Sequence, residues 1–201
     1  MIPPLSKEIW FNEDIHSVRK LEFKQWNGSQ RSLFYEPDEF YLSRKDLLGS
    51  ENGGVAVAVA RGWAVSHLDI VNKTAYLNGG HEIKCGKCLI STGATPKQLS
   101  IIENSDPRVR DVTTTYRNIY DFEALYKSLA NSQSVAIIGG GFLGSELACA
   151  FGQRTKKDSN FKVYQIFREG GNMGKVLPEY LSYWTTEKIK GEGVNVRRQY
   201  L

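Results

Sequence analysis

The stretch 135-VAIIGGGFLGSELACAFG-152 decides the fold of this chain. Its first four residues are apolar and mostly β-branched, which is typical of a buried strand in a parallel sheet. Three glycines in the spacing G-x-G-x-x-G follow directly, and this spacing is that of a dinucleotide-binding turn. Apolar residues then recur every four positions and predict a helix over Phe142–Gln153. The order strand, glycine turn and helix gives the motif its expected structural context.

Each glycine of the motif has a physical role. Gly139 permits the tight turn from strand to helix, and Gly141 lets the backbone approach a pyrophosphate. Gly144 lets the helix lie close against the strand. The N–H groups and the dipole at the start of the helix favour phosphate charge. The alternative is a glycine turn that serves the fold and binds no ligand.

The residues after the motif extend the same unit. A second strand is predicted over Lys162–Phe167, and Glu169 follows where the ribose-binding acid of a dinucleotide site belongs. A further helix begins near Pro178, and 191-GEGVNV-196 ends it and starts a third strand. The sequence therefore predicts an α/β fold with a β-α-β-α-β mononucleotide-binding unit of the Rossmann type in residues 96–201.

Residues 1–95 are predicted to form a separate, β-rich and incomplete domain. Two hairpins are expected, one at about residues 21–35 around Asn27-Gly28 and one around Asn78-Gly79. The apolar run 55-VAVAVA-60 predicts a strand, and so does 87-KCLIST-92. The second of these strands ends in Thr92-Gly93, a glycine turn suited to abut a cofactor.

Composition restricts the class of protein. The chain has 201 residues, 41% hydrophobic residues and a net charge of +4, which is ordinary for a globular protein and does not by itself indicate nucleic acid. No apolar run approaches the ~20 residues of a membrane span. We expect no targeting signal in this chain, because residues 1–4 resemble neither a signal nor a transit peptide.

The three cysteines cannot form a fully paired disulfide framework. Cys85 and Cys88 spell C-x-x-C, but the motif opens a predicted strand rather than a helix, and no second C-x-x-C completes a zinc site. We therefore expect no metal site, with a buried structural Cys88 beside an incidental Cys85. A redox or metal role for the pair is the alternative.

Several stretches of the sequence are distinctive, namely 3-PPLSKEIWF-11, 23-FKQWNG-28, 51-ENGGVAV-57, 87-KCLISTGATP-96, the glycine motif and 171-GNMGKVLPEYLSYWT-185. Together they resemble the apoptosis-inducing factor family of FAD-containing NADH oxidoreductases. The glycine motif and the STGATP turn are shared by many flavin reductases, whereas FKQWNG and GNMGKVLPEYL are much more specific. The resemblance implies a flavoreductase fold, with a partial FAD domain in residues 1–95 and a partial NAD domain in residues 96–201.

The resemblance implies roles at the junction of flavin and nicotinamide. Lys7 matches a lysine beside the flavin that pairs with the helix glutamate, here Glu146, and Phe142 matches the aromatic that packs at the nicotinamide. These three residues are the expected catalytic residues. Without the resemblance, Glu146 also fits a simple acid that interacts with the dipole of its own helix.

The resemblance also assigns cofactor contacts. For NAD(H) they are the motif glycines, Glu169 and Lys175. Glu169 in place of an arginine at the ribose favours NAD over NADP. For FAD they are Lys7, Val65, Thr92, Gly93 and Arg117.

Partners and location follow from the resemblance as well. The hairpin of residues 21–35, with Trp26, would link cofactor reduction to dimerisation. Lys87 and Lys97 match basic positions implicated in nonspecific DNA binding, although the sequence alone favours a merely solvated basic face. The resemblance implies the mitochondrial intermembrane space, protein partners there, and the nucleus during apoptosis.

The sequence is expected to depart from the family pattern in three respects. We expect that no targeting sequence is present and that the region after Leu201, which should complete the NAD domain, is missing. The family's first glycine motif, which holds the FAD pyrophosphate, is absent, so the chain is expected to be a fragment that purifies without stoichiometric FAD. The expected function is hydride transfer from NADH to flavin, linked to cell death, with an impaired activity of the isolated chain. The alternatives are a non-catalytic NAD(H)- or partner-binding fragment and a flavin-free NAD-dependent dehydrogenase; the late position of the glycine motif argues against the latter.

Overall fold

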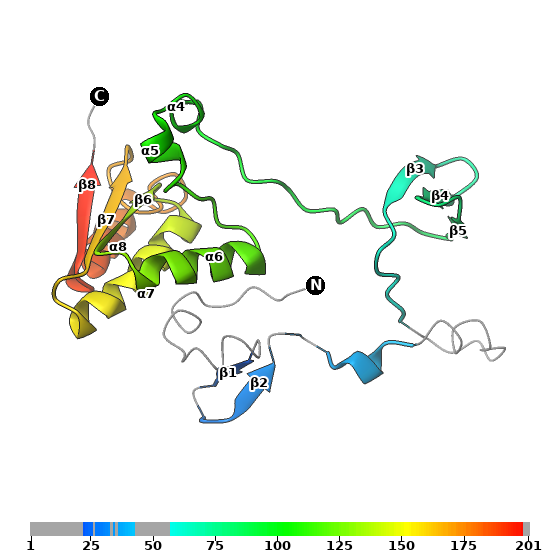
Figure 1. Ribbon diagram of the computed structural model, residues 1–201, viewed down its shortest axis with the longest axis horizontal. Helices are drawn as coiled ribbons and strands as arrows, with labels where there is room; N and C mark the ends of the chain where they lie inside the picture. Colours follow the sequence, from blue (N-terminus) through cyan, green and yellow to red (C-terminus); the bar gives the residue numbers. More distant parts are fainter. Residues whose placement is uncertain (1–21, 26, 33, 35, 43–56, 199–201) are drawn as a thin grey trace. The chain divides into compact units, whose positions relative to one another are not determined.

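The computed structural model describes residues 22–25, 27–32, 34, 36–42 and 57–198 (Figure 1). Contacts divide the chain into two units, residues 36–95 and the remainder. The division after residue 95 lies where the sequence changes character. Which cofactor each predicted domain binds remains a prediction.

A three-stranded parallel sheet forms the centre of the larger unit, in the order β6-β7-β8. Its strands are β6 (Ser134–Ile138), β7 (Lys162–Phe167) and β8 (Val194–Arg198). All three coincide with strands that the apolar, β-branched runs predict. Val163 pairs with Val135 on one side and Val194 on the other, so the middle of β7 is enclosed by both neighbours.

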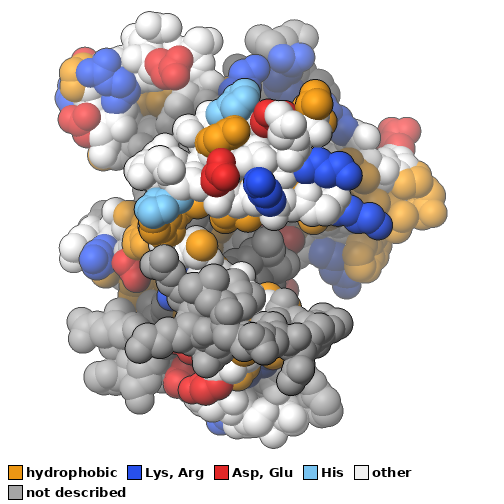
Figure 2. Space-filling model, turned by 90° about the vertical axis from the view of Figure 1, so that its right-hand side faces the viewer, with side chains coloured by type: hydrophobic (Ala, Val, Ile, Leu, Met, Phe, Trp, Pro, Cys, Tyr) orange, Lys and Arg blue, Asp and Glu red, His pale blue; other side chains and the backbone are white. Residues whose placement is uncertain are grey.

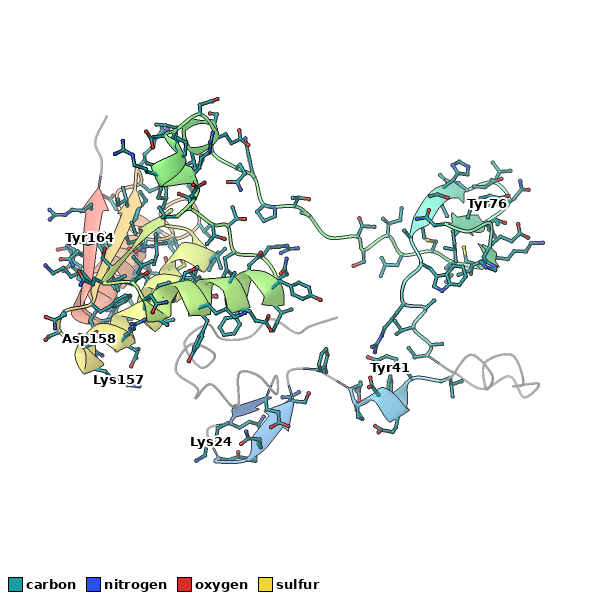
Figure 3. All side chains as sticks on the ribbon, viewed as in Figure 1. Lys24, Tyr41, Tyr76, Lys157, Asp158 and Tyr164 are labelled. Carbon is teal, nitrogen blue, oxygen red and sulfur yellow. The ribbon has the colours of Figure 1, made fainter. Side chains whose placement is uncertain are left out.

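Two helices connect these strands and cover one face of the sheet. The glycine motif leads into α7 (Phe142–Lys157), and α8 (Glu179–Gly191) follows β7. The helix α7 contacts all three strands, α8 contacts β8, and the helices contact each other (Figure 1). Figure 3 labels Tyr164 on β7, and Lys157 and Asp158 at the C-terminal end of α7, the end opposite the glycine turn.

Three further helices precede the sheet. The helix α6 (Ile119–Ala130) begins with a capping box in which Asn118 and Asp121 satisfy each other's backbone N–H groups. Two single-turn helices, α4 (Ser100–Glu103) and α5 (Pro107–Arg110), lie earlier in the chain. None of the described helices is both long and apolar enough to cross a membrane.

The hydrophobic core lies between the sheet and its helices. Leu147 and Phe151, which belong to the apolar stripe predicted for α7, are buried together with Val163 of β7 and Ile189 of α8. Burial of these four apolar side chains stabilises the unit by roughly 1.5–3 kcal/mol each. The core therefore holds the N-terminal end of α7 at a fixed position beside the C-terminal edge of the sheet.

The remaining described elements are five strands that pair antiparallel and one 3-10 helix. Their bounds are β1 (Glu22–Lys24), β2 (Gln30–Ser32), the 3-10 helix η1 (Asp38–Phe40), β3 (Val65–Asp69), β4 (Thr74–Leu77) and β5 (Glu82–Lys84). The hairpin β1-β2 and the sheet β3-β4-β5 confirm both predicted hairpins. Gly28 and Gly79 have φ of +85° and +89° in the two turns, a conformation that favours glycine.

Several predictions for the smaller unit were wrong. Residues 57–60 and 87–92 are not strands, and Leu89 is 90% exposed. A strand needs a ladder of backbone hydrogen bonds to a neighbour, and neither segment belongs to a described sheet. Residues 57–60 show one backbone bond to another described segment, from Leu42 N to Val57 O at 2.9 Å. Cys88 is exposed rather than buried, whereas Cys85 is half-buried and its thiol donates to the carbonyl of Lys73 at 3.3 Å.

Candidate nucleotide-binding site

The glycine turn between β6 and α7 has the geometry that its spacing predicts. Gly139 has a φ of +126°, in the region that side chains disfavour, and its N–H donates to the carbonyl of Ile166 at 2.8 Å. A Cβ at Gly144 would overlap the carbonyl oxygen of Gly139. A Cβ at Gly140 would lie 2.7 Å from the ring of Phe167. Gly139 and Gly144 thus allow the turn and the close contact of helix and strand.

Gly141 differs from these glycines because open space surrounds it. A Cβ there would meet no atom within 4 Å, and its φ of −75° is ordinary for any residue. Gly141 is the N-cap of α7, and no side chain caps the helix at this position. The first N–H groups of a 16-residue helix are therefore open to an anion, and the helix dipole favours negative charge there.

Glu169 lies at the same edge of the sheet as the glycine turn. It follows β7 by two residues, and β7 is the parallel neighbour of β6, so both strands present their C-terminal ends to this edge. Lys175 Nζ lies 3.3 Å from Glu169 Oε1. The pKa of Glu169 is lowered, first by a hydrogen bond from the backbone N–H of Glu169 itself and also by Lys175. The Glu169 carboxylate is therefore charged at neutral pH. The loop that carries both residues is tied to the turn, because Met173 N–H donates to Gly140 O at 2.6 Å.

Phe142 and Glu146 lie on the first turns of α7. Phe142, the first residue of the helix, is 56% exposed, so its ring is accessible to a ligand at the turn. Glu146 is exposed. The pKa of Tyr116 is raised to about 12, mainly because its ring is buried, and the negative charges of Asp121 and Glu146 add to this rise.

The other predicted site residues are not brought together by the described structure. Lys7 and Trp26 lie outside the described residues, so the pairing of Lys7 with Glu146 stays a prediction. Val65, 60% exposed on β3, belongs to the smaller unit with Thr92 and Gly93, whereas Arg117 belongs to the larger unit. The assignment of these four residues to FAD rests on the resemblance.

Lys87 and Lys97 are exposed, as a role in binding DNA would require. Figure 2 shows Lys and Arg side chains next to acidic and hydrophobic ones. Exposure alone is equally consistent with a solvated face, and DNA binding stays a prediction.

Sequence reasoning missed a set of polar residues beneath the turn. Gln165 and Asn172 are both fully buried, and Gln165 Nε2 donates to the carbonyl of Gly139 at 3.0 Å. The sequence places Gln165 on the same strand face as the apolar Val163 and Phe167, but it does not reveal the partners of the glutamine. Every second residue of β7 is buried, from Val163 to Phe167, and a glutamine within such an apolar alternation must find a partner inside.

Comparisons with known proteins agree with this geometry. A family model described as pyridine nucleotide-disulphide oxidoreductase matches residues 3–200. The chain is 46% identical over 98% of its length to a mitochondrial apoptosis-inducing factor 1 of Drosophila melanogaster, and 37% identical over 96% to that of Dictyostelium discoideum. It spans only 26% and 34% of these two relatives.

Solved structures show the same fold. A ferredoxin reductase from Rhodopseudomonas palustris matches 83% of this chain and 36% of its own, with a TM-score of 0.62 and 21% identity. An NADH:rubredoxin oxidoreductase from Clostridium acetobutylicum matches 72% of this chain and 35% of its own, with a TM-score of 0.54 and 21% identity. At this identity the likeness concerns the fold alone.

Proposed function

Because the chain belongs to the pyridine nucleotide-disulphide oxidoreductase family, we propose that its glycine turn binds NADH within an FAD-dependent oxidoreductase of the apoptosis-inducing-factor type. Members of this family are FAD-containing, NAD(P)H-dependent reductases. The observation that carries the proposal is the turn itself. Its glycines shape an uncapped helix start, and open space lies over Gly141.

The residues at the turn fit a dinucleotide. The open N–H groups at the start of α7 suit the two charges of a pyrophosphate, and Gly141 leaves room for it to approach. The carboxylate of Glu169 would accept hydrogen bonds from the adenosine ribose hydroxyls. A 2′-phosphate would meet like charge at Glu169, so the site favours NADH over NADPH.

The proposed reaction is hydride transfer from NADH. Bound FAD would supply the hydride acceptor. In this chain, Phe142 would pack against the nicotinamide at the helix start, and Glu146, one turn further along α7, would contribute negative charge nearby. Val65, Thr92 and Gly93, together with Arg117, would contact FAD on the strength of the resemblance.

The wider biology stays a proposal. Two relatives are named as mitochondrial apoptosis-inducing factors, which supports a mitochondrial protein with a role in cell death. Dimerisation on reduction, intermembrane-space partners and a nuclear role rest on the resemblance. The second candidate is a non-catalytic NAD(H)-binding fragment; the chain spans 26% and 34% of these relatives.

Titration of the chain with NADH and NADPH tests the proposed nucleotide site. NADH should bind more tightly than NADPH. Glu169→Ala should lower the affinity for NADH by about tenfold or more, since a hydrogen bond to a charged group is worth ~1.5–3 kcal/mol. The same change should narrow the difference between the affinities for NADH and NADPH.

Glu192→Ala is the matched control. Glu192 is also paired with a lysine, Lys156, but it lies beside the opposite end of α7. Its removal subtracts the same charge from the same unit and should leave NADH affinity unchanged. Equal affinities for NADH and NADPH, or an equal effect of both substitutions, would contradict the proposed role of Glu169.

A further inference from the structure

A cluster of buried polar side chains lies beneath the glycine turn. None of its members is more than 5% exposed, and they come from β7, α7, α8 and the loop between β7 and α8. We call it the buried polar cluster, and its members are Ser145, Gln165, Asn172, Ser182 and Thr186.

Asn172 is the centre of the buried polar cluster. Its side-chain Nδ2 donates to Gln165 Oε1 at 2.8 Å and to Ser145 Oγ at 2.9 Å. Its backbone is held as well, because its N–H donates to Thr186 Oγ1 at 2.8 Å and its carbonyl accepts from Ser182 Oγ at 2.8 Å. Its Oδ1 is buried without a partner in the part of the chain that the structure describes, at a cost of about 1–3 kcal/mol. The four bonds must offset that cost.

The cluster reaches two carbonyl groups of the glycine turn. Gln165 Nε2 donates to Gly139 O at 3.0 Å. Gly140 O accepts from Met173 N at 2.6 Å and from Ser145 Oγ at 3.4 Å. Met173 has a φ of +55°, which is unusual for a residue with a side chain. The hydrogen bonds of the neighbouring Asn172 hold the loop, and so keep Met173 in this disfavoured conformation.

The orientation of these carbonyls fixes that of the adjacent amides. In a planar trans peptide the C=O and the following N–H point in opposite directions. Because the carbonyls of Gly139 and Gly140 point toward the cluster, the N–H groups of Gly140 and Gly141 point away from it. Open space surrounds the Cβ position of Gly141.

We propose that the buried polar cluster is a positioning device for nucleotide phosphate. Gln165, Asn172 and Thr186 are buried beneath the turn, and by holding the Gly139 and Gly140 carbonyls inward they aim the amide of the exposed Gly141 at the pyrophosphate. This inference rests on the proposed NADH site and names residues that set the affinity of that site for NADH. It also couples the loop carrying Glu169 and Lys175 to the same turn, through Met173.

Two neighbouring threonines of α8 give a matched test. Thr186 Oγ1 accepts from Asn172 N and donates to the carbonyl of Ser182, whereas Thr185 Oγ1 donates to the carbonyl of Leu181. Thr186→Val and Thr185→Val therefore remove the same hydroxyl and the same bond within the helix, and only the first removes the acceptor for Asn172.

The expected result is a difference between the two variants. Thr186→Val should weaken NADH binding about fivefold to tenfold, the effect of one lost hydrogen bond, and Thr185→Val should not. Thr186→Ser, which keeps the hydroxyl, should restore wild-type affinity. Amide resonances of Gly140 and Gly141 in the ligand-free chain should shift in Thr186→Val and in Gln165→Met but not in Thr185→Val.

The outcomes separate this inference from the proposed function. If the wild-type chain binds NADH and Thr186→Val binds it equally well, the positioning role is overturned and the NADH site stands. If the wild-type chain binds no NADH, both are overturned. Valine is close to threonine in shape, so Thr186→Val keeps the test available if Gln165→Met does not fold.

Discussion

At the scale of single residues, Tyr116 reports on the charges around the first turns of α7. Its ring is half-buried and packs against the core, while its electrostatic environment includes Asp121 of α6 and Glu146 of α7. Burial and both carboxylates disfavour the phenolate. Their joint effect is the raised pKa, about 12 against an ordinary value of 10.0.

A spectroscopic titration checks this environment. The absorbance of tyrosinate, measured as the difference between the wild-type chain and Tyr116→Phe, should rise with a midpoint near pH 12 rather than 10. Because the folded pKa is raised, the neutral phenol stabilises the fold fully below pH 10, and this stability is lost as the pH rises from 10 through 12. Glu146→Gln should lower the midpoint. A midpoint near 10 would place Tyr116 in water, away from both carboxylates.

At the scale of elements, the contact between α7 and the end of β6 depends on Gly144. A Cβ there would overlap a backbone carbonyl, which cannot move aside as a flexible side chain can. Gly144→Ala should therefore displace α7 and destabilise the unit by about 1–3 kcal/mol, as overpacking does. Urea unfolding followed by helical circular dichroism measures this, since every described α-helix lies in the larger unit.

Gly191→Ala is the control for that measurement. Gly191 is the last residue of α8, and a Cβ there would meet no atom within 4 Å. This change should leave stability unchanged or raise it by up to about 1 kcal/mol, because alanine favours helix. Equal effects of Gly144→Ala and Gly191→Ala would show that the close approach at Gly144 is absent.

Elements of the larger unit could be predicted from the sequence because their patterns are local. The run Val135–Ile138 lies within β6, and the helix predicted over Phe142–Gln153 falls within α7, extended by one turn at its C-terminal end. The run 87-KCLIST-92 also contains residues that favour strands, Ile90 and Thr92, yet it is not a strand. Pairing with a neighbour decides strand formation, and propensity does not reveal the neighbour.

The same limit applies to the candidate site. Spacing identifies Gly139, Gly141 and Gly144 because each glycine answers a local steric demand, and Glu169 follows from the length of the unit. Gln165 and Asn172 could not be found in this way. Their function depends on a network that joins three elements, and only the folded structure brings those elements together.

At the scale of the whole molecule, the proposed function requires that the start of α7 is a nucleotide site rather than a glycine turn that serves the fold alone. Gly141 separates these two roles. Its ordinary φ and open surroundings mean that the fold does not require glycine at this position. A bound pyrophosphate would require it, because a methyl group would occupy the space through which the phosphate approaches.

The most direct test is NADH binding to the wild-type chain and to Gly141→Ala, measured by titration together with urea unfolding of both proteins. The unfolding free energy should stay within about 1 kcal/mol of wild type. Alanine is a poorer N-cap than glycine by about 1 kcal/mol, but it lowers the entropy of the unfolded chain, which offsets about 0.4–1 kcal/mol of that loss. The affinity for NADH should fall by about tenfold or more, because a methyl group at the turn forces the pyrophosphate away from the helix N–H groups. Unchanged affinity in a stable Gly141→Ala chain would contradict the central claim and leave the glycine turn a structural feature.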